Sequence, residues 1–287
     1  MWKIELKFKY PVIIKKASTM ANKALMNETL LQLKELETGY SGGKNPVVIS
    51  RKIEASLVLG QFVAILGPNG AGKSTLMKTI LGHLVPLSGE VLWKGRPLHQ
   101  MSVKQVARCM SAVLTDKIDD RYLTAVDVVS TGRYPYGSLT GRLTQEDRQI
   151  ISSSMKSTGV THLSERRFFS LSDGEKQKTM IARALAQNTP LICLDEPTAF
   201  IDSPGKVAIM QLLKGLVADK TKTVLLTTHD SELALQFADE LWLVGKNHTF
   251  EAGTPTSLIG NGHINQLFDQ EGVIFNPSTL RFESKYF

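Results

Sequence analysis

A glycine-rich run followed by lysine and serine is the part of this sequence best suited to chemistry. It matches the phosphate-loop pattern GxxxxGK[ST] and consists of Gly67, Pro68, Asn69, Gly70, Ala71, Gly72, Lys73 and Ser74. Glycines let the backbone close around phosphates, so that N–H groups and the positive end of a following helix face the oxygen atoms. We expect Lys73 to reach the β- and γ-phosphates of a nucleotide and Ser74 to ligate its Mg²⁺.

The segments on either side of this run support a phosphate loop. Residues 61–66 are apolar and predict a strand, whereas residues 73–82 predict a helix. If the run were only a glycine-rich turn with an incidental lysine, it would need neither a strand before it nor a helix after it. We therefore predict that the run binds a nucleotide together with Thr75, the next helical residue.

A second candidate site lies where an apolar run, residues 191–194, ends in Asp195 and Glu196. Such a run predicts a buried strand, and ligands bind at strand ends in parallel sheets. We expect Asp195 to hold Mg²⁺ through water and Glu196 to act as general base on the water that attacks the γ-phosphate. Two adjacent carboxylates alone can be a solvated turn, but the phosphate loop favours the functional interpretation.

The composition is that of an ordinary globular protein. The 287 residues are 42% hydrophobic and 21% charged, enough for one large core or two joined subdomains. Cys109 and Cys193 form no CxxC pair, which argues against a disulfide framework or zinc site and fits a reducing cytosol. The net charge of +7 suits an anionic partner, but the Lys and Arg residues are scattered, so charge decides little.

No stretch of the sequence approaches the roughly 18 consecutive apolar residues that a membrane-spanning helix needs. Any membrane role must therefore come from a partner. Residues 1–25 mix Lys with apolar residues and do not have the form of a signal peptide. We assign them to an N-terminal extension, which is either a mis-assigned start or an accessory strand.

Apolar runs and amphipathic segments alternate along most of the chain. Such alternation predicts an α/β fold with a largely parallel sheet covered by helices. A mostly helical stretch, residues 124–187, interrupts the alternation and is interpreted as an inserted subdomain. The predicted strands begin near Leu31 and then cover residues 61–66, 90–93, 110–114, 191–194, 223–227 and 240–244; the other predicted helices cover residues 73–82, 103–108, 204–217 and 231–237.

The run from Leu171 to Glu175 reads LSDGE and resembles the LSGGQ signature of ABC ATPases. The resemblance covers roughly Leu31 to Gly253 and includes Pro197, Thr198, Asp202 and His229 in the family's order. It implies a P-loop NTPase (RecA-like) core with an antiparallel β-subdomain and an inserted helical ABC-specific subdomain. The implied ABC ATPase domain is 26–253, with the helical subdomain at about 116–187 and a small C-terminal appendage at 254–287, for which we favour a cover over the sheet edge.

The same resemblance implies roles for further residues. In the family, the signature loop caps the ATP held by the other subunit, so Ser172 and Gly174 are expected to face the γ-phosphate of a partner in a homodimer. His229 is expected to contact the γ-phosphate and hold the attacking water with Glu196. Asp202 matches the D-loop aspartate, and Tyr40 matches the aromatic residue that stacks on adenine.

Two departures from the family pattern bear on these roles. The signature has Asp173 and Glu175 where glycine and glutamine are common. Glu175 adds negative charge near the γ-phosphate unless Lys176 or Lys178 offsets it. At the Q-loop, where the family has glutamine, this sequence has Thr115 and Asp116, and Asp116 is a candidate Mg²⁺ ligand.

Residues 123–136 resemble the ATPase subunits of iron-siderophore, haem and cobalamin importers. This resemblance implies an ATPase that uses ATP and Mg²⁺ and lies peripherally at the cytoplasmic face of the inner (plasma) membrane. It also implies that the ATPase energises integral-membrane permease subunits, to which a substrate-binding protein delivers the cargo. No nucleic acid is expected as a partner.

Two other functions remain open. The first is a soluble non-transport ABC ATPase acting on nucleic acid or the ribosome, although such proteins usually carry a long coiled coil or two nucleotide domains. The second is a generic P-loop kinase, which would need neither residues 171–175 nor His229.

Overall fold

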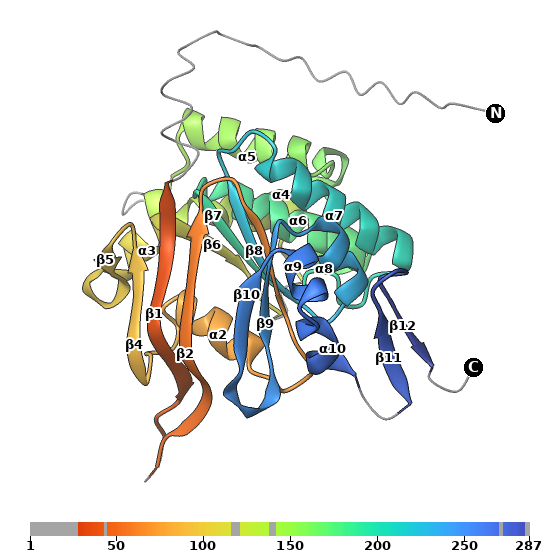
Figure 1. Cartoon of the computed structure of the whole chain (residues 1–287). Helices are drawn as coiled ribbons and strands as arrows, with labels where there is room; N and C mark the ends of the chain where they lie inside the picture. Colours follow the sequence, from red (N-terminus) through yellow and green to blue (C-terminus); the bar gives the residue numbers. More distant parts are fainter. Residues whose placement is uncertain (1–27, 43–44, 116–120, 138–141, 270–271, 285–287) are drawn as a thin grey trace, which may run out of the picture.

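The computed structural model describes residues 28–42, 45–115, 121–137, 142–269 and 272–284. A central sheet carries helices on both faces, and a second sheet lies beside it (Figure 1). The extension predicted at residues 1–25 lies outside the described residues. Within the described ranges, no helix has both the length and the apolar character needed to cross a membrane.

The central sheet has the strand order β10-β9-β3-β8-β7-β6 in the described part of the chain. All of its neighbouring pairs are parallel except β9 with β10. The predicted parallel sheet is confirmed, and β10, which was not predicted, is a short mixed-polarity segment that pairs with the edge of β9. Its strands are β3 (Phe62–Leu66), β6 (Met110–Val113), β7 (Leu191–Asp195), β8 (Thr223–Thr228), β9 (Glu240–Val244) and β10 (Phe250–Gly253).

Both faces of the inner strands are buried, which explains why β3 and β7 are nearly continuous apolar runs. Along β3, Val63 and Ile65 enter one core cluster, whereas Phe62, Ala64 and Leu66 enter the other. The first cluster lies against α2 (Lys73–Ile80) and α3 (Val103–Cys109). The second lies against α6 (Asp173–Ala186), α7 (Ser203–Val217) and α8 (Ser231–Phe237).

The second sheet is antiparallel, with the order β2-β1-β4-β5, and matches the predicted β-subdomain. The sequence patterns did not predict β2, because its buried residues are three and four positions apart (Ser50, Ile53 and Leu57) and charged residues lie between them, so the strand lacks a regular alternation. A short helix, η1 (Leu98–Gln100), follows this sheet. The strands are β1 (Thr29–Tyr40), β2 (Val47–Val58), β4 (Ser88–Trp93) and β5 (Arg96–Pro97).

The stretch between β6 and β7 is helical, as predicted, and has its own apolar core. Three of its helices begin with a capping box, formed at Thr124, Thr144 and Ser172. Its elements are α4 (Ala125–Ser130), η2 (Thr131–Tyr136), α5 (Gln145–Ser157), η3 (Thr161–Leu163), η4 (Phe168–Ser170) and α6.

A buried ion pair connects three elements of this helical stretch. Arg133 of η2 donates through Nε to Oδ1 of Asp147 in α5 at 2.7 Å, and through Nη1 to the Ala186 carbonyl of α6 at 2.8 Å. The Thr144 backbone N–H and the Arg133 side chain hold the pKa of Asp147 below its ordinary value. A depressed folded-state pKa stabilises the fold above the unfolded-state pKa, and this stabilisation is lost as the pH falls through the folded-state pKa.

We expect Arg133→Met to lower the free energy of unfolding by about 3 kcal/mol, because it leaves the Asp147 carboxylate and the Ala186 carbonyl without their partner. Urea denaturation of the whole chain measures this loss. Arg148→Met, an exposed arginine on α5, is the matched control and should change stability by less than about 0.5 kcal/mol. Equal losses in the two variants would contradict a stabilising role for the pair.

The C-terminal segment packs on the face of the central sheet that carries α7 and α8. Leu258, Ile264 and Phe275 are buried in the same core cluster as these helices. The segment is therefore part of the core, whereas the sequence suggested a cover over the sheet edge. After η5 (Lys246–His248) and β10 come α9 (Pro255–Gly260), α10 (His263–Phe268), β11 (Val273–Asn276) and β12 (Arg281–Ser284), the last two forming an antiparallel hairpin.

Candidate functional site

The phosphate-loop run connects β3 to α2 and has a backbone that requires glycine at two positions. A Cβ atom at Gly67 would lie 2.1 Å from the Val244 carbonyl oxygen. Gly72 has a φ of 104°, and a Cβ there would lie 2.2 Å from Cγ2 of Ile49. Gly72 is also the N-cap of α2 and supplies no side-chain cap. The first turn of α2 therefore keeps N–H groups for a ligand, which fits a phosphate.

The Lys73 side chain folds back over this loop. Its ammonium group donates to the carbonyl oxygens of Gly67 at 2.8 Å and Pro68 at 3.2 Å, and lies 3.9 Å from Oε1 of Glu196. Burial lowers the pKa of Lys73, and the nearby carboxylates of Glu196 and Asp195 partly oppose this shift. The lysine charge thus lies between the loop and the carboxylate predicted to activate water.

Three oxygen-bearing side chains meet beside α2. Oδ1 of Asp195 accepts hydrogen bonds from Oγ of Ser74 at 3.1 Å and from Oγ1 of Thr227 at 2.5 Å. Among the described residues, no group of three or more His, Cys, Asp or Glu side chains could by itself hold a metal. This donor set suits Mg²⁺, which commonly takes one or two protein oxygens and completes its shell with phosphate and water.

Glu196 is held in an unusual backbone conformation next to His229. Its φ is 50°, in the left-handed region, and its N–H donates to Oγ1 and the carbonyl oxygen of Thr227. Oε2 of Glu196 lies 2.8 Å from Nδ1 of His229. The carboxylate is 17% exposed and the imidazole 53% exposed. A water molecule can therefore reach the Glu196 carboxylate, whose orientation is fixed by its bond to His229.

Two further predicted nucleotide contacts, Tyr40 and Asp202, lie on different elements. Tyr40, at the end of β1, is 46% exposed, and its hydroxyl lies 3.2 Å from Oγ1 of Thr75 on α2. This contact places an aromatic ring beside the phosphate loop. Asp202 is the N-cap of α7 and accepts from the Gly205 N–H at 3.2 Å. Asp116 lies outside the described residues.

The signature run begins α6 and is separate from the loop of its own chain. Ser172 is the N-cap, and Gly174 lies in the first turn of the helix. Within the described part of the chain, no hydrogen bond or ion pair connects Ser172 or Gly174 with residues 67–74. The structure thus brings together Lys73, Ser74, Asp195, Glu196 and His229, but not the signature.

The charge of Glu175 is balanced differently from the sequence-based expectation. Its Oε2 accepts from the backbone N–H of Ser172 at 2.8 Å and from the Ser172 hydroxyl at 3.0 Å, and its Oε1 lies 3.6 Å from Nη1 of Arg166. These bonds, the Ser172 N–H foremost, lower the pKa of Glu175. The offsetting cation is therefore Arg166, because neither Lys176 nor Lys178 forms an ion pair with Glu175 among the described residues.

We expect Glu175→Gln to change ATP turnover by less than about threefold, because glutamine retains the capping box and removes only an exposed ion pair. Steady-state ATP hydrolysis checks this. Glu175→Ala, which removes the cap as well, should lower both thermal stability and turnover. If glutamine and alanine were equally harmful, the charge rather than the cap would be the important property.

Thr227 is the site residue that the sequence interpretation missed. It bonds to both members of the acidic pair and so aligns Asp195 with Glu196. The sequence does contain a signal for Thr227, because two threonines follow the apolar run at residues 224–226 and immediately precede His229. Polar residues at the end of a buried strand indicate a site when a neighbouring strand ends in carboxylates.

A family model described as ABC transporter matches residues 50–199. An uncharacterized ABC transporter ATP-binding protein of Methanocaldococcus jannaschii is 38% identical over 89% of this chain and 87% of its own length. The chain belongs to the ABC transporter family. This ABC ATPase is also similar to the iron(3+)-hydroxamate import ATP-binding protein FhuC of Bacillus subtilis, at 33% identity over 87% of this chain and 91% of that protein.

Two further comparisons agree. A cobalamin import ATP-binding protein, BtuD of Halobacterium salinarum, is 35% identical over 79% of this chain and 57% of its own length. A solved dimeric ATP-binding cassette in a post-hydrolysis state with ADP and Pi matches with a TM-score of 0.68 and 27% identity, covering 79% of this chain and 99% of that one. The predicted fold and the resemblance to the importer ATPase group are confirmed, and the chain is an ABC-type ATPase that binds ATP.

Proposed function

We propose that this ABC ATPase energises an importer for an iron complex (siderophore or haem) or cobalamin, acting as a homodimer on separate permease subunits. The observation that best supports ATP hydrolysis is the 2.8 Å hydrogen bond between Oε2 of Glu196 and Nδ1 of His229, next to the ammonium group of Lys73. The cargo class is supported by the relatives named for import of iron(3+)-hydroxamate and of cobalamin.

In the proposed reaction, water attacks the γ-phosphorus of ATP, and the bond from that phosphorus to the bridging β–γ oxygen breaks. Glu196 accepts a proton from the water, and His229 holds the Glu196 carboxylate in place. Lys73 and the N–H groups of the loop balance the charge on the phosphate oxygens. Ser74 and Asp195 would hold Mg²⁺, which when bound neutralises charge on the β- and γ-phosphates.

A second copy of the chain would complete each site. Ser172 and Gly174 lie at the start of α6, where helix N–H groups attract a phosphate oxygen. Because they do not contact the loop of their own chain, we assign them to the ATP held by the partner. Closure of the dimer around two ATP molecules and reopening after hydrolysis would then drive the permease.

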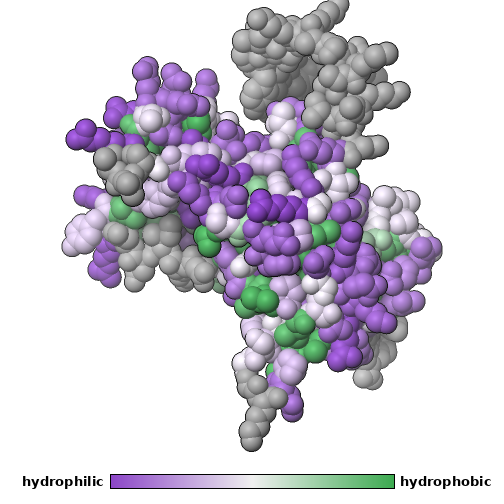
Figure 2. All heavy atoms as spheres, turned by 90° about the vertical axis from the view of Figure 1, so that its left-hand side faces the viewer, coloured by the Kyte–Doolittle hydropathy of each residue, from purple (hydrophilic) through white to green (hydrophobic). Residues whose placement is uncertain are grey.

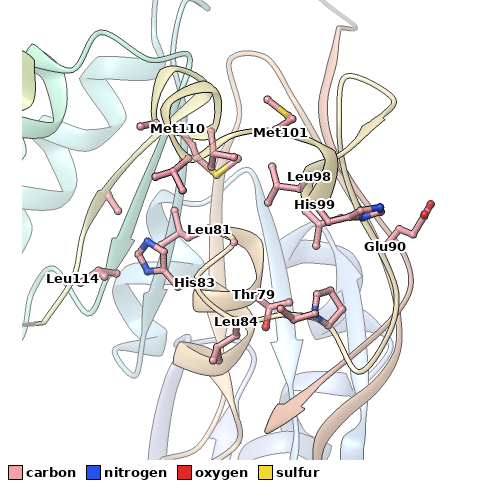
Figure 3. Close-up of a pocket in the computed structure, with 18 of the residues that line it drawn as sticks. Thr79, Leu81, His83, Leu84, Glu90, Leu98, His99, Met101, Met110 and Leu114 are labelled. Atoms are coloured by element: carbon pink, nitrogen blue, oxygen red, sulfur yellow. The ribbon is translucent and has the colours of Figure 1, made fainter. Parts of the chain in front are cut away.

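The proposed permease contact is a groove between the core and the helical stretch. It is lined by residues from the end of α2, η1, α3, β6 and α6 (Figure 3), and its volume is about 830 Å³. The face that carries β4, β5 and α3 shows hydrophobic areas among hydrophilic side chains (Figure 2). Such contact would place the chain peripherally at the cytoplasmic face of the inner membrane.

The test is ATP hydrolysis by the purified chain, alone and with its permease in lipid nanodiscs. We expect the permease to raise turnover, and to raise it further with a loaded substrate-binding protein. Turnover that no permease affects, but that nucleic acid or ribosomes stimulate, would overturn the transport proposal in favour of a soluble ABC ATPase.

A further inference from the structure

His229 lies between two residues that fix the chain on either side of it. Thr228 is the last residue of β8, and Asp230 is the N-cap of α8. The backbone N–H of Asp230 donates to Oγ1 of Thr228 at 3.0 Å, so a local turn encloses the histidine. Within the described part of the chain, the imidazole itself forms one hydrogen bond, with Glu196. The orientation of His229 therefore depends on how its neighbours are held.

The Asp230 carboxylate connects two helices. Its Oδ1 accepts from the backbone N–H of Leu233 at 3.2 Å and thereby caps α8. Its Oδ2 accepts from Nζ of Lys206, on α7, at 3.3 Å. Helices α7 and α8 lie side by side on one face of the central sheet (Figure 1). Lys206 therefore ties the residue after His229 to a helix outside its own segment.

The segment after Glu196 leads directly into α7. Residues 197–201 connect the two, and the Ala199 N–H donates to the Glu196 carbonyl at 3.1 Å. Asp202 then caps α7, and the Lys206 N–H closes the first turn of this helix on the Asp202 carbonyl at 2.9 Å. The helix that carries Lys206 is therefore joined to Glu196 by a short, hydrogen-bonded connection.

Contacts between these segments form a closed ring. From Glu196 the chain reaches α7, and Lys206 connects α7 to Asp230. His229 is the residue before Asp230, and its imidazole bonds to Glu196 and completes the ring. Thr227 also contacts Glu196, but through the backbone N–H, so it does not orient the imidazole. In this ring, the Lys206 ion pair holds the segment after His229 against α7.

The exposure of this ion pair favours a role in orientation over one in stability. The side chains of Lys206 and Asp230 are 28% and 20% exposed, and a partly exposed pair contributes little to the free energy of unfolding. Removal of Lys206 leaves Asp230 as the cap of α8, so the helix should persist. What changes is the direction in which Asp230, and with it His229, is held.

We propose that Lys206 is a positioning residue for ATP hydrolysis, whose ion pair with Asp230 keeps His229 in the orientation that holds the Glu196 carboxylate. This inference rests on the proposed role of His229 in holding that carboxylate. Among the described residues, Lys206 forms no hydrogen bond or ion pair with the phosphate loop. It should therefore affect the rate of hydrolysis and not the binding of ATP.

The experiment measures kcat and KM for ATP hydrolysis by the full chain. Lys206→Met should lower kcat about tenfold and change KM by less than about twofold, because a misdirected general base slows the chemical step. Lys206→Arg keeps the positive charge and should retain kcat within about threefold of wild type. Lys214→Met is the matched control, since it removes another α7 ion pair, with Asp239 at 2.5 Å. It should leave kcat within about twofold of wild type.

Two further variants test whether Lys206 acts through Asp230 and His229. Asp230→Asn keeps a cap on α8 but removes the charge, so it should lower kcat about as much as Lys206→Met. The double variant should be no slower than either single variant, because both changes remove the same contact. In a His229→Gln background, which is itself slow, Lys206→Met should lower kcat by less than a further twofold.

Thermal unfolding separates misfolding from mispositioning, since Lys206→Met and Lys214→Met should unfold at similar temperatures while their kcat values differ. Equal kcat values for these two variants would overturn the positioning role and leave hydrolysis through Glu196 and His229 standing. A further tenfold loss on adding Lys206→Met to His229→Gln would also overturn it, because the lysine would then act by another route. Undiminished turnover in His229→Gln alone would instead overturn the proposed role of His229, and this inference with it.

Discussion

Glu196→Gln is expected to retain ATP binding, to lower ATP turnover by about 10²- to 10⁴-fold, and to trap the closed dimer. Glutamine keeps the size of the side chain and can still bond to His229, but it cannot accept a proton from the attacking water. ATP binding is measured by equilibrium titration, turnover by phosphate release, and dimerisation by light scattering with ATP present.

Glu146→Gln provides the matched control for Glu196→Gln. It makes the same change from carboxylate to amide, but at an exposed glutamate on α5 outside the site. We expect turnover of this variant to stay within about twofold of wild type. Undiminished turnover in Glu196→Gln would show that another group accepts the proton.

Lys73→Ala is expected to weaken ATP binding at least about 100-fold, because it removes the buried cation of the phosphate loop and leaves the Gly67 carbonyl without its donor. The loss should appear in the dissociation constant as well as in turnover, which distinguishes it from Glu196→Gln. Titration with a fluorescent ATP analogue measures the constant.

Lys78→Ala is the control for Lys73→Ala, because it lies on the same helix but is exposed. It should bind ATP within about twofold of wild type, as exposed substitutions away from a site usually have small effects. A Lys73→Ala chain that bound ATP as tightly as Lys78→Ala would contradict the assignment of this run as the phosphate-binding loop.

Much of the fold was predictable because its strands are apolar on both faces. Runs such as Phe62–Leu66 and Leu191–Asp195 are buried at every position and need no partner to be recognised. Strands β2, β5, β10 and β12 were not predicted. They have exposed or polar positions and form because a neighbouring strand offers unpaired backbone groups. Their hydrophobic periodicity is weak, because these segments become strands by pairing with neighbouring strands in the folded protein.

The site shows the same division. Lys73, Ser74, Asp195 and Glu196 were identifiable because their chemistry is contained in short runs at strand ends. The contribution of Thr227 depends on β8 lying beside β7, a neighbour relation between segments far apart in the sequence. The pairing of Glu175 with Arg166 also depends on how the chain before α6 folds back on its first turn.

The sequence by itself determined the nucleotide, the acidic pair and the family, because each depends on residue types at fixed local spacing. Only the tertiary structure decided which cation balances Glu175, how the C-terminal segment joins the core, and that Thr227 aligns the acidic pair. These are relations between residues distant in the chain, and their energies depend on distance and burial, which local spacing does not specify.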